Sequence, residues 1–77
     1  MDEKELKRMI KEVFRYYKSD LISKKEFEEY FRSRGLSDSE IEQLWLKAHT
    51  HEIITIGIDP ITEEVMFELK KKMRRII

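Results

Sequence analysis

His49 and His51 are separated by one residue, and this H-x-H spacing would let two imidazole rings bind one metal ion from the same face of a β-strand. Glu52 is the one nearby side chain that stands out as a third ligand. Histidines are also favourable near the C-terminal end of a helix, where the helix dipole stabilises positive charge. We prefer this explanation and expect no metal site.

Other arrangements that support catalysis are missing from the sequence. It contains no Ser/His/Asp spacing, no Gly-rich phosphate loop, no zinc motif and no cysteine. Carboxylates are abundant, but they fall where solvated helix faces need them. We therefore expect a non-enzymatic protein with no catalytic residues and no cofactor.

Lysine and arginine are arranged in a way that suits phosphate binding. Between positions 4 and 18, six of them fall within roughly a 100° arc of a helical projection, and no acid lies in that arc. They are Lys4, Lys7, Arg8, Lys11, Arg15 and Lys18. A second group closes the chain: Lys70, Lys71, Lys72, Arg74 and Arg75. The first group is either a solvated helix face or a phosphate-binding stripe.

The formal net charge is zero, but the charges are segregated along the chain. Residues 1–34 carry a net charge of +2, residues 35–69 carry −7, and residues 70–77 carry +5. This pattern indicates two surfaces that meet different partners.

With 77 residues the chain is long enough for one small domain. It has no apolar run long enough to cross a membrane, and its charged N-terminus does not resemble a signal peptide. We expect a cytoplasmic protein. A charged fraction of 42%, one glutamine and no asparagine are typical of thermophiles, and we expect an archaeal source.

The basic stripe lies on a predicted helix over residues 2–18, whose opposite face is apolar. A second helix is predicted to begin at Ser23, where Glu26 completes a capping box, and to end at Gly35. A third is predicted to begin at Ser37, again with a capping box. Its apolar stripe is Ile41, Leu44, Trp45 and Ala48; its outward face is Ser39, Glu42, Gln43, Leu46 and Thr50.

Alternating residues at 53–58 and 65–69 predict a β-hairpin that turns at Asp59-Pro60-Ile61-Thr62. In this register Ile56 lies opposite Val65 and Ile54 lies opposite Phe67, on one buried face. One alternative is a helix over 62–76, capped by Thr62 and ending in the basic residues. A mixed outcome, a short strand followed by a helix from about Leu69, is open as well.

Helix, short strand, two helices and hairpin is the element order of a winged helix-turn-helix domain. The residues that carry this resemblance are "LISKKEFEEYFRSRGLSDSEIEQLW" for the two-helix unit and "IITIGIDPITEEVMFEL" for the wing. The chain resembles small winged-helix domains of archaeal transcription and replication proteins, over roughly residues 4–69. The resemblance implies an α+β domain of three helices and a C-terminal hairpin over residues 1–69, a basic tail over 70–77, and DNA binding by the third helix and the wing.

The charges of this chain favour a different mode of binding. The third helix offers Lys47 alone against Asp38, Glu40 and Glu42, and the wing has no base before Lys70. Because phosphate neutralisation supplies much of DNA affinity, a duplex should be repelled there. We expect DNA to be held by the basic face of helix 2–18 and by the tail.

A second resemblance is to a degenerate, calcium-free EF-hand pair. "VFRYYKSDLISKKEFEEYF" is similar to half of an EF-hand, and "IDPITEEVMFELKKKM" to the other half. A calcium loop needs twelve residues with oxygen ligands at fixed positions, and neither stretch has one. This reading implies an all-helical interaction domain without metal.

Two functions remain open. The first is an accessory module in transcription or replication that binds DNA backbone without sequence preference. The second is a protein–protein interaction subunit of a larger nucleic-acid-processing complex, which docks through the acidic third helix and the wing. Its partner-binding residues would be Glu42, Gln43, Leu46 and Thr50. Apolar residues within 73–77 leave a dimer open as well.

Overall fold

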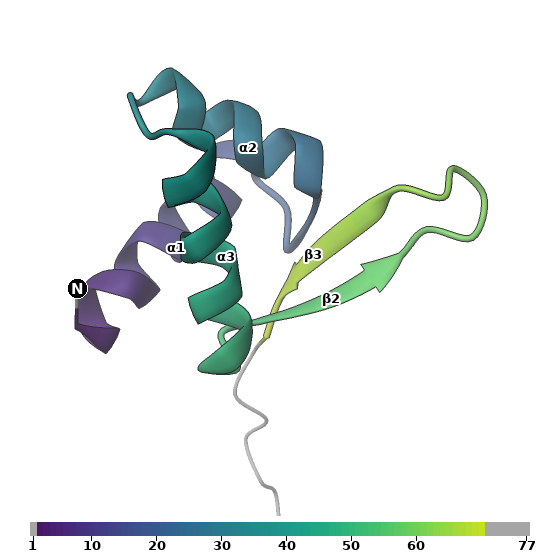
Figure 1. Ribbon diagram of the computed structural model, residues 1–77. Coiled ribbons are helices and arrows are strands. Elements are labelled where there is room, and N and C mark those ends of the chain that lie inside the picture. The colour runs from purple at the N-terminus through teal and green to yellow at the C-terminus, as the bar shows by residue number, and fades with distance from the viewer. Residues whose placement is uncertain (1, 71–77) are drawn as a thin grey trace, which may run out of the picture.

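The structure is a computed structural model that describes residues 2–70 (Figure 1). Three helices and three strands make an α+β fold that ends in a β-hairpin, as the sequence predicts. In chain order these are α1 (Glu3–Tyr17), β1 (Leu21–Ser23), α2 (Lys24–Ser33), α3 (Asp38–Thr50), β2 (Ile54–Ile58) and β3 (Val65–Leu69). Of the predicted tail, residues 71–77 lie outside the described part of the chain.

The predicted capping residues set the helix boundaries. Ser23 begins α2 with a complete capping box: its Oγ accepts from the Glu26 N–H at 3.0 Å, and its own N–H donates to the Glu26 carboxylate at 2.9 Å. Ser37 and Glu40 repeat this arrangement at the start of α3. Gly35 follows α2 with φ +93°, a left-handed conformation in which a side chain would be strained. The boundaries between these helices were therefore predictable from sequence.

The three strands form one antiparallel sheet in the order β1-β3-β2. This layout is compatible with a winged helix, because the short strand between the first two helices completes the sheet of the hairpin. Val65–Leu69 is a strand, so the alternative helix over 62–76 is wrong there. The EF-hand reading is wrong too, because its second half folds into the hairpin instead of a helix pair.

The predicted hairpin register is wrong by two residues. The sequence placed Ile56 opposite Val65 and Ile54 opposite Phe67, whereas Ile56 lies opposite Phe67 and Ile54 opposite Leu69. A shift by an even number keeps the same side chains on the same face, so Ile54 and Phe67 are still buried.

The cause of this shift is a six-residue connection over 59–64 where a four-residue turn was expected. The Asp59 carboxylate accepts from the backbone N–H groups of Ile61 and Thr62, at 2.8 and 3.2 Å. Glu63 adopts a left-handed conformation with φ +62°, and its N–H donates to the Asp59 carbonyl at 2.7 Å. The connection therefore closes two residues later than a simple turn.

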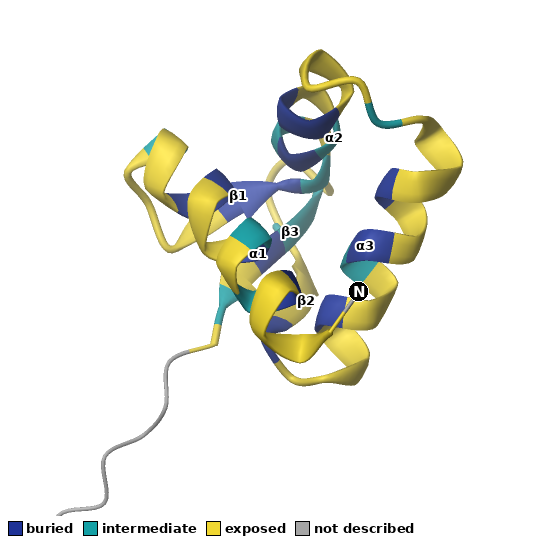
Figure 2. Cartoon of the chain, turned by 90° about the vertical axis from the view of Figure 1, so that its left-hand side faces the viewer, coloured by how far each residue is buried: buried dark blue, intermediate teal, exposed yellow. Residues whose placement is uncertain are grey.

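The core lies between the helices and one face of the sheet (Figure 2). Phe67, at the centre of the sheet, is fully buried and packs edge-on against Phe27 of α2, with ring centroids 5.2 Å apart. Trp45 of α3 lies 5.4 Å from the same ring. Phe67 of the central strand thus packs against both α2 and α3, the helices of the two-helix unit.

The far end of the hairpin extends beyond the helices, as Figure 1 shows. Along β2 the exposed fraction of the side chain rises from 1% at Ile54 to 36% at Ile56 and 69% at Ile58. These residues lie on one face of the strand, so the difference reflects the end of helix coverage. Ile61 in the connection is 90% exposed.

Candidate nucleic-acid interface

The basic face of α1 is set by the residues on its other side. Leu6, Ile10, Val13 and Phe14 are buried in the core, which fixes the rotation of the helix. The basic residues on the helix therefore project away from the core, along about 16 Å between positions 4 and 15 at 1.5 Å per residue. A shallow depression follows this face, and its lining is Lys4, Lys7, Arg8, Lys11, Glu12 and Arg15.

Most bases of this face are free of acidic partners. Lys7 forms an ion pair with Glu3, one helical turn away, at 3.4 Å. Among the described residues no acid lies within ion-pair distance of the other five. Lys18 follows the helix in a left-handed conformation with φ 53°. The face thus presents unneutralised charge at the surface, which is the requirement for phosphate binding.

Lys70, the one described residue of the predicted basic tail, is paired with an acid. Its Nζ lies 2.8 Å from a carboxylate oxygen of Glu52, beyond the end of α3. This hydrogen bond and charge lower the pKa of the Glu52 carboxyl. Lys70 is therefore already partly neutralised. The other predicted tail contacts, at Lys71, Lys72, Arg74 and Arg75, lie outside the described residues.

The outward face of α3 is exposed and acidic. Glu42, Gln43, Leu46 and Thr50 are all at the surface, as predicted. The Thr50 hydroxyl donates to the Leu46 carbonyl of its own helix at 2.9 Å, so its proton is already used. Hydrogen bonds from the Ser37 backbone and hydroxyl lower the pKa of Glu40, which adds negative charge to this helix end.

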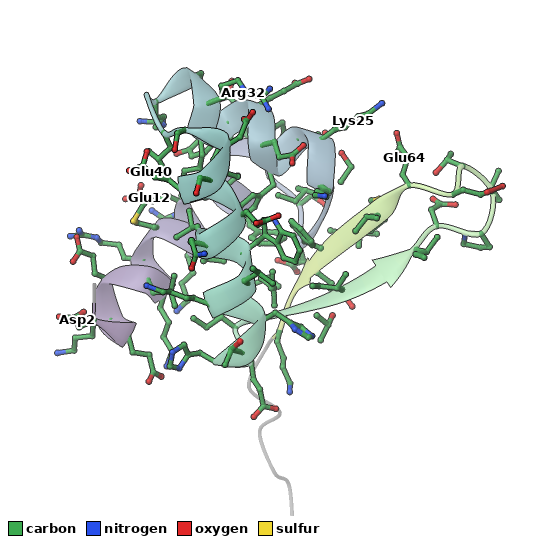
Figure 3. All side chains as sticks on the ribbon, viewed as in Figure 1. Asp2, Glu12, Lys25, Arg32, Glu40 and Glu64 are labelled. Carbon is green, nitrogen blue, oxygen red and sulfur yellow. The ribbon has the colours of Figure 1, made fainter. Side chains whose placement is uncertain are left out.

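Residues of both charges lie at the hairpin end nearest α2. A hollow between the first turn of α2 and the start of β3 is lined by residues of both signs, which are Ser23, Lys24, Lys25, Glu28, Glu63, Glu64 and Val65. Figure 3 shows Lys25 and Glu64 on the two sides of this opening. Lys24 is directed to the Trp45 ring, 5.4 Å from its centroid. The mixed charge gives this side no continuous phosphate-binding surface.

His49 and His51 do not form a metal site with Glu52. Each lies at the end of α3, where positive charge is favourable. His51 Nδ1 lies 3.8 Å from a carboxylate oxygen of Glu3 on α1. Within residues 2–70 no group of three or more potential ligands is close enough to hold a metal ion.

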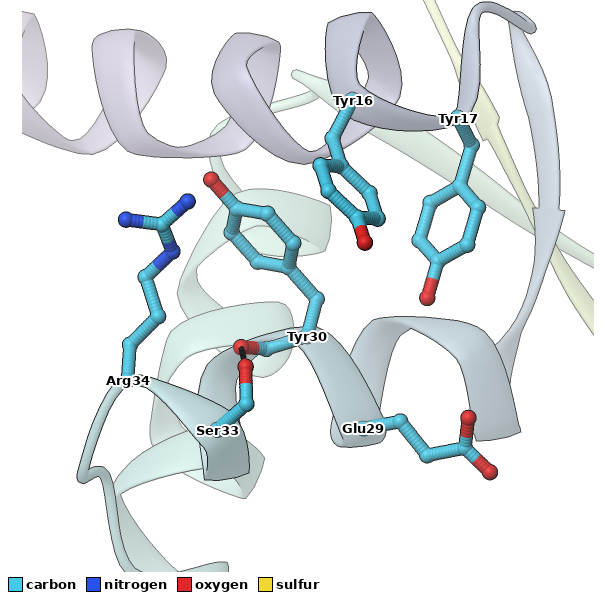
Figure 4. Close-up of a pocket in the computed structure, with 6 residues that line it drawn as sticks. All are labelled: Tyr16, Tyr17, Glu29, Tyr30, Ser33 and Arg34. Carbon is cyan, nitrogen blue, oxygen red and sulfur yellow. Dashed lines mark hydrogen bonds between the residues drawn. The ribbon is translucent and has the colours of Figure 1, made fainter.

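A tyrosine hollow between α1 and α2 was not predicted from sequence (Figure 4). The exposed Tyr16 ring lies 5.1 Å from Tyr30 and 4.9 Å from Tyr17. Arg34 lies over the other side of Tyr30, 4.5 Å from the ring centroid. The Tyr17 hydroxyl donates to the Glu26 carbonyl at 3.0 Å. The Tyr16–Tyr30 contact and the Tyr17 hydrogen bond hold α1 against α2 and so help to fix the direction of the basic face.

Burial raises the pKa of Tyr17, and the nearby charges of Glu26 and Glu29 raise it further. Tyr17 therefore remains a neutral hydrogen-bond donor at physiological pH. The only sequence signal for this cluster was the pair Tyr16-Tyr17 at the end of the apolar face of α1.

Comparisons with known proteins return no match: no protein-family model, no curated protein and no solved structure matches the chain. No helix within residues 2–70 has both the length and the apolar character needed to cross a membrane. The case for a function therefore comes from the residues of this chain.

Proposed function

We propose that the protein is a small non-enzymatic winged-helix module that binds nucleic-acid backbone, as an accessory protein in transcription or replication. The element order and the sheet order β1-β3-β2 support the winged-helix assignment. In DNA-binding proteins of this architecture, a helix and a wing approach the duplex. Here the charges favour a different surface of the same fold.

The observation that carries the proposal is the row of bases on α1 that have no ion-pair partner among the described residues. Arg8, Lys11 and Arg15 lie on neighbouring turns of this exposed face. Structural surface charges usually alternate in sign, but Glu12 is the one acid that lines this depression. Lys and Arg in such a row neutralise phosphates and release counterions, which gives affinity without base readout.

The outward face of α3 is a poor alternative for the same task. Lys47 is the one lysine or arginine of this helix, and the first turn carries Asp38 and Glu40. Gln43 has the right chemistry for a base edge, but the charge around it repels phosphate. Binding should therefore be weak, tolerant of sequence and steeply dependent on salt.

Fluorescence anisotropy with a labelled duplex at low salt tests the proposal. Replacing Lys7, Lys11 and Arg15 by Glu should abolish binding, whereas replacing Gln43 and Lys47 by Ala should change it much less. All of these side chains project from helix surfaces, and a thermal melt checks that each variant folds. Normal binding by the first variant together with loss in the second would overturn the proposal in favour of a major-groove reader.

A second candidate function is docking onto a basic protein partner of a nucleic-acid-processing complex. Leu46 favours it, because this side chain is 41% exposed between Glu42 and Thr50. An apolar anchor with an acidic rim suits a basic protein surface. If neither the wild-type protein nor the variants bind nucleic acid at low salt, this candidate is the one to pursue.

A further inference from the structure

We propose that two copies of this chain pair along the outer edge of β2 and form a dimer with a continuous antiparallel sheet. The sheet order leaves β2 at an edge, with no described strand beyond it. An edge strand presents unpaired backbone groups that can pair with another chain. The pairing partner is a second copy, for reasons of hydrogen bonding, of charge and of exposed apolar surface.

The backbone groups that face outward can be assigned from the hydrogen bonds at the two ends of the hairpin. Lys70 N–H donates to the Ile53 carbonyl at one end, and Asp59 N–H donates to the Glu64 carbonyl at the other, both at 2.9 Å. In an antiparallel ladder the residues bonded to one neighbour alternate with those that face away. Ile54, Ile56 and Ile58 therefore direct their N–H and C=O groups to the open edge.

One register satisfies all of these groups at once. A two-fold axis at Ile56 places Ile56 opposite its own copy and Ile54 opposite Ile58 of the second chain. The residues of each pair exchange backbone hydrogen bonds. Moving the register by two residues toward the tip would place Ile54 opposite Pro60, which has no N–H to donate.

Edge strands of monomeric proteins are usually protected by charged residues, proline or a bulge. The stretch Ile53–Ile58, "IITIGI", has no charged residue and no proline. A Cβ added at Gly57 would meet no atom within 4 Å, so the strand is also open on that side. Nothing in β2 itself opposes pairing with an identical strand.

Apolar exposure points to the same register. Ile58 is 69% exposed at the end that the helices leave uncovered. In the two-fold pair it lies opposite Ile54 of the second copy, which is 1% exposed because it belongs to the core of that copy. Each hairpin thus extends its uncovered end along the covered end of the other.

Charge favours the antiparallel arrangement of the two copies. The tip of the hairpin carries Asp59, Glu63 and Glu64, whereas at its base Lys70 is paired with Glu52. Antiparallel pairing separates the two acidic tips and places each beside the base of the other copy. A parallel arrangement would place the two acidic tips together.

Light scattering coupled to size exclusion tests the dimer. The wild-type protein should show twice the chain mass of 9.5 kDa. The variant Thr55→Lys/Gly57→Lys places lysines opposite each other across the two-fold axis and should halve that mass. The control Ser39→Lys/Gln43→Lys adds the same charge on α3 and should remain dimeric. A monomeric wild type, or a dimeric edge variant, would overturn the proposal.

A cross-linking test does not depend on the folding of the lysine variant. The chain contains no cysteine. With Ile56→Cys the two Cα atoms lie about 5.5 Å apart across the axis, which is within disulfide range. With Ile58→Cys they lie about 15 Å apart, from four residues at ~3.4 Å each along the strand and about 5.5 Å across the pair. Mild oxidation should join the first variant into a covalent dimer and leave the second, more exposed position mostly unjoined. The reverse order, or equal slow rates, would contradict this register.

Discussion

Replacing Arg8, Lys11 and Arg15 by Gln should weaken DNA binding by an amount that can be calculated from the number of lost phosphate contacts. Glutamine removes the charge but keeps a good helix propensity, so α1 should remain folded. Each lost contact lowers the slope of log K against log salt by about 0.9, so three lower it by about 2.7. If the wild type and this variant bind DNA equally at 1 M salt, the affinity of the variant at 0.1 M salt should be about 500-fold below that of the wild type.

Fluorescence anisotropy at a series of salt concentrations measures this slope. The matched control replaces Lys24, Lys25 and Lys47 by Gln, which removes the same charge from the side of the molecule nearest α3 and the hairpin. If net charge alone controlled binding, both variants would lose affinity equally. The proposal requires an almost unchanged slope for the control. An unchanged slope for the α1 variant would refute the reasoning, because no phosphate would then be bound by that face.

Three further predictions concern stability. Tyr17→Phe should cost about 1 kcal/mol through loss of the hydrogen bond to Glu26. The folded-state pKa of Tyr17 is raised above 10.0, so the neutral hydroxyl stabilises the wild-type fold fully below pH 10. This stabilisation should be lost as the pH rises through the folded-state pKa. The variant should lose less stability over the same pH range, as pH-dependent melts would show. Lys18→Gly should stabilise the fold by about 1 kcal/mol in urea titrations, because glycine adopts the left-handed backbone conformation at this position without strain. The same variant should bind DNA more weakly, because it loses one positive charge. Phe67→Ala should cost about 3–5 kcal/mol and Ile61→Ala almost nothing, and equal costs in chemical denaturation would disprove the described core.

The features that the sequence predicted well depend on short-range geometry. A capping box joins residues three positions apart, so Ser23 with Glu26 and Ser37 with Glu40 could be recognised directly. Gly35 followed from the need for a left-handed residue after a helix. The basic face of α1 followed from helical periodicity alone, and the structure places five of its six members, all but Lys18, along one depression.

The features that were missed depend on contacts between distant residues or on loop conformation. The hairpin register failed because the Asp59 carboxylate and the left-handed Glu63 lengthen the connection, and periodicity does not report loop length. The pair between Lys70 and Glu52 spans 18 positions, so no local pattern could show that Lys70 is paired with an acid. The contact between Tyr16 and Tyr30 likewise depends on how α2 packs against α1.

The most direct test of the central claim is an NMR titration of the ¹⁵N-labelled protein with a short duplex at low salt. Shift changes should concentrate on the backbone amides of α1 between Lys4 and Lys18, and they should be similar for duplexes of unrelated sequence. They should diminish as salt is added. Changes centred on α3 and the hairpin, with α1 unaffected, would contradict the account.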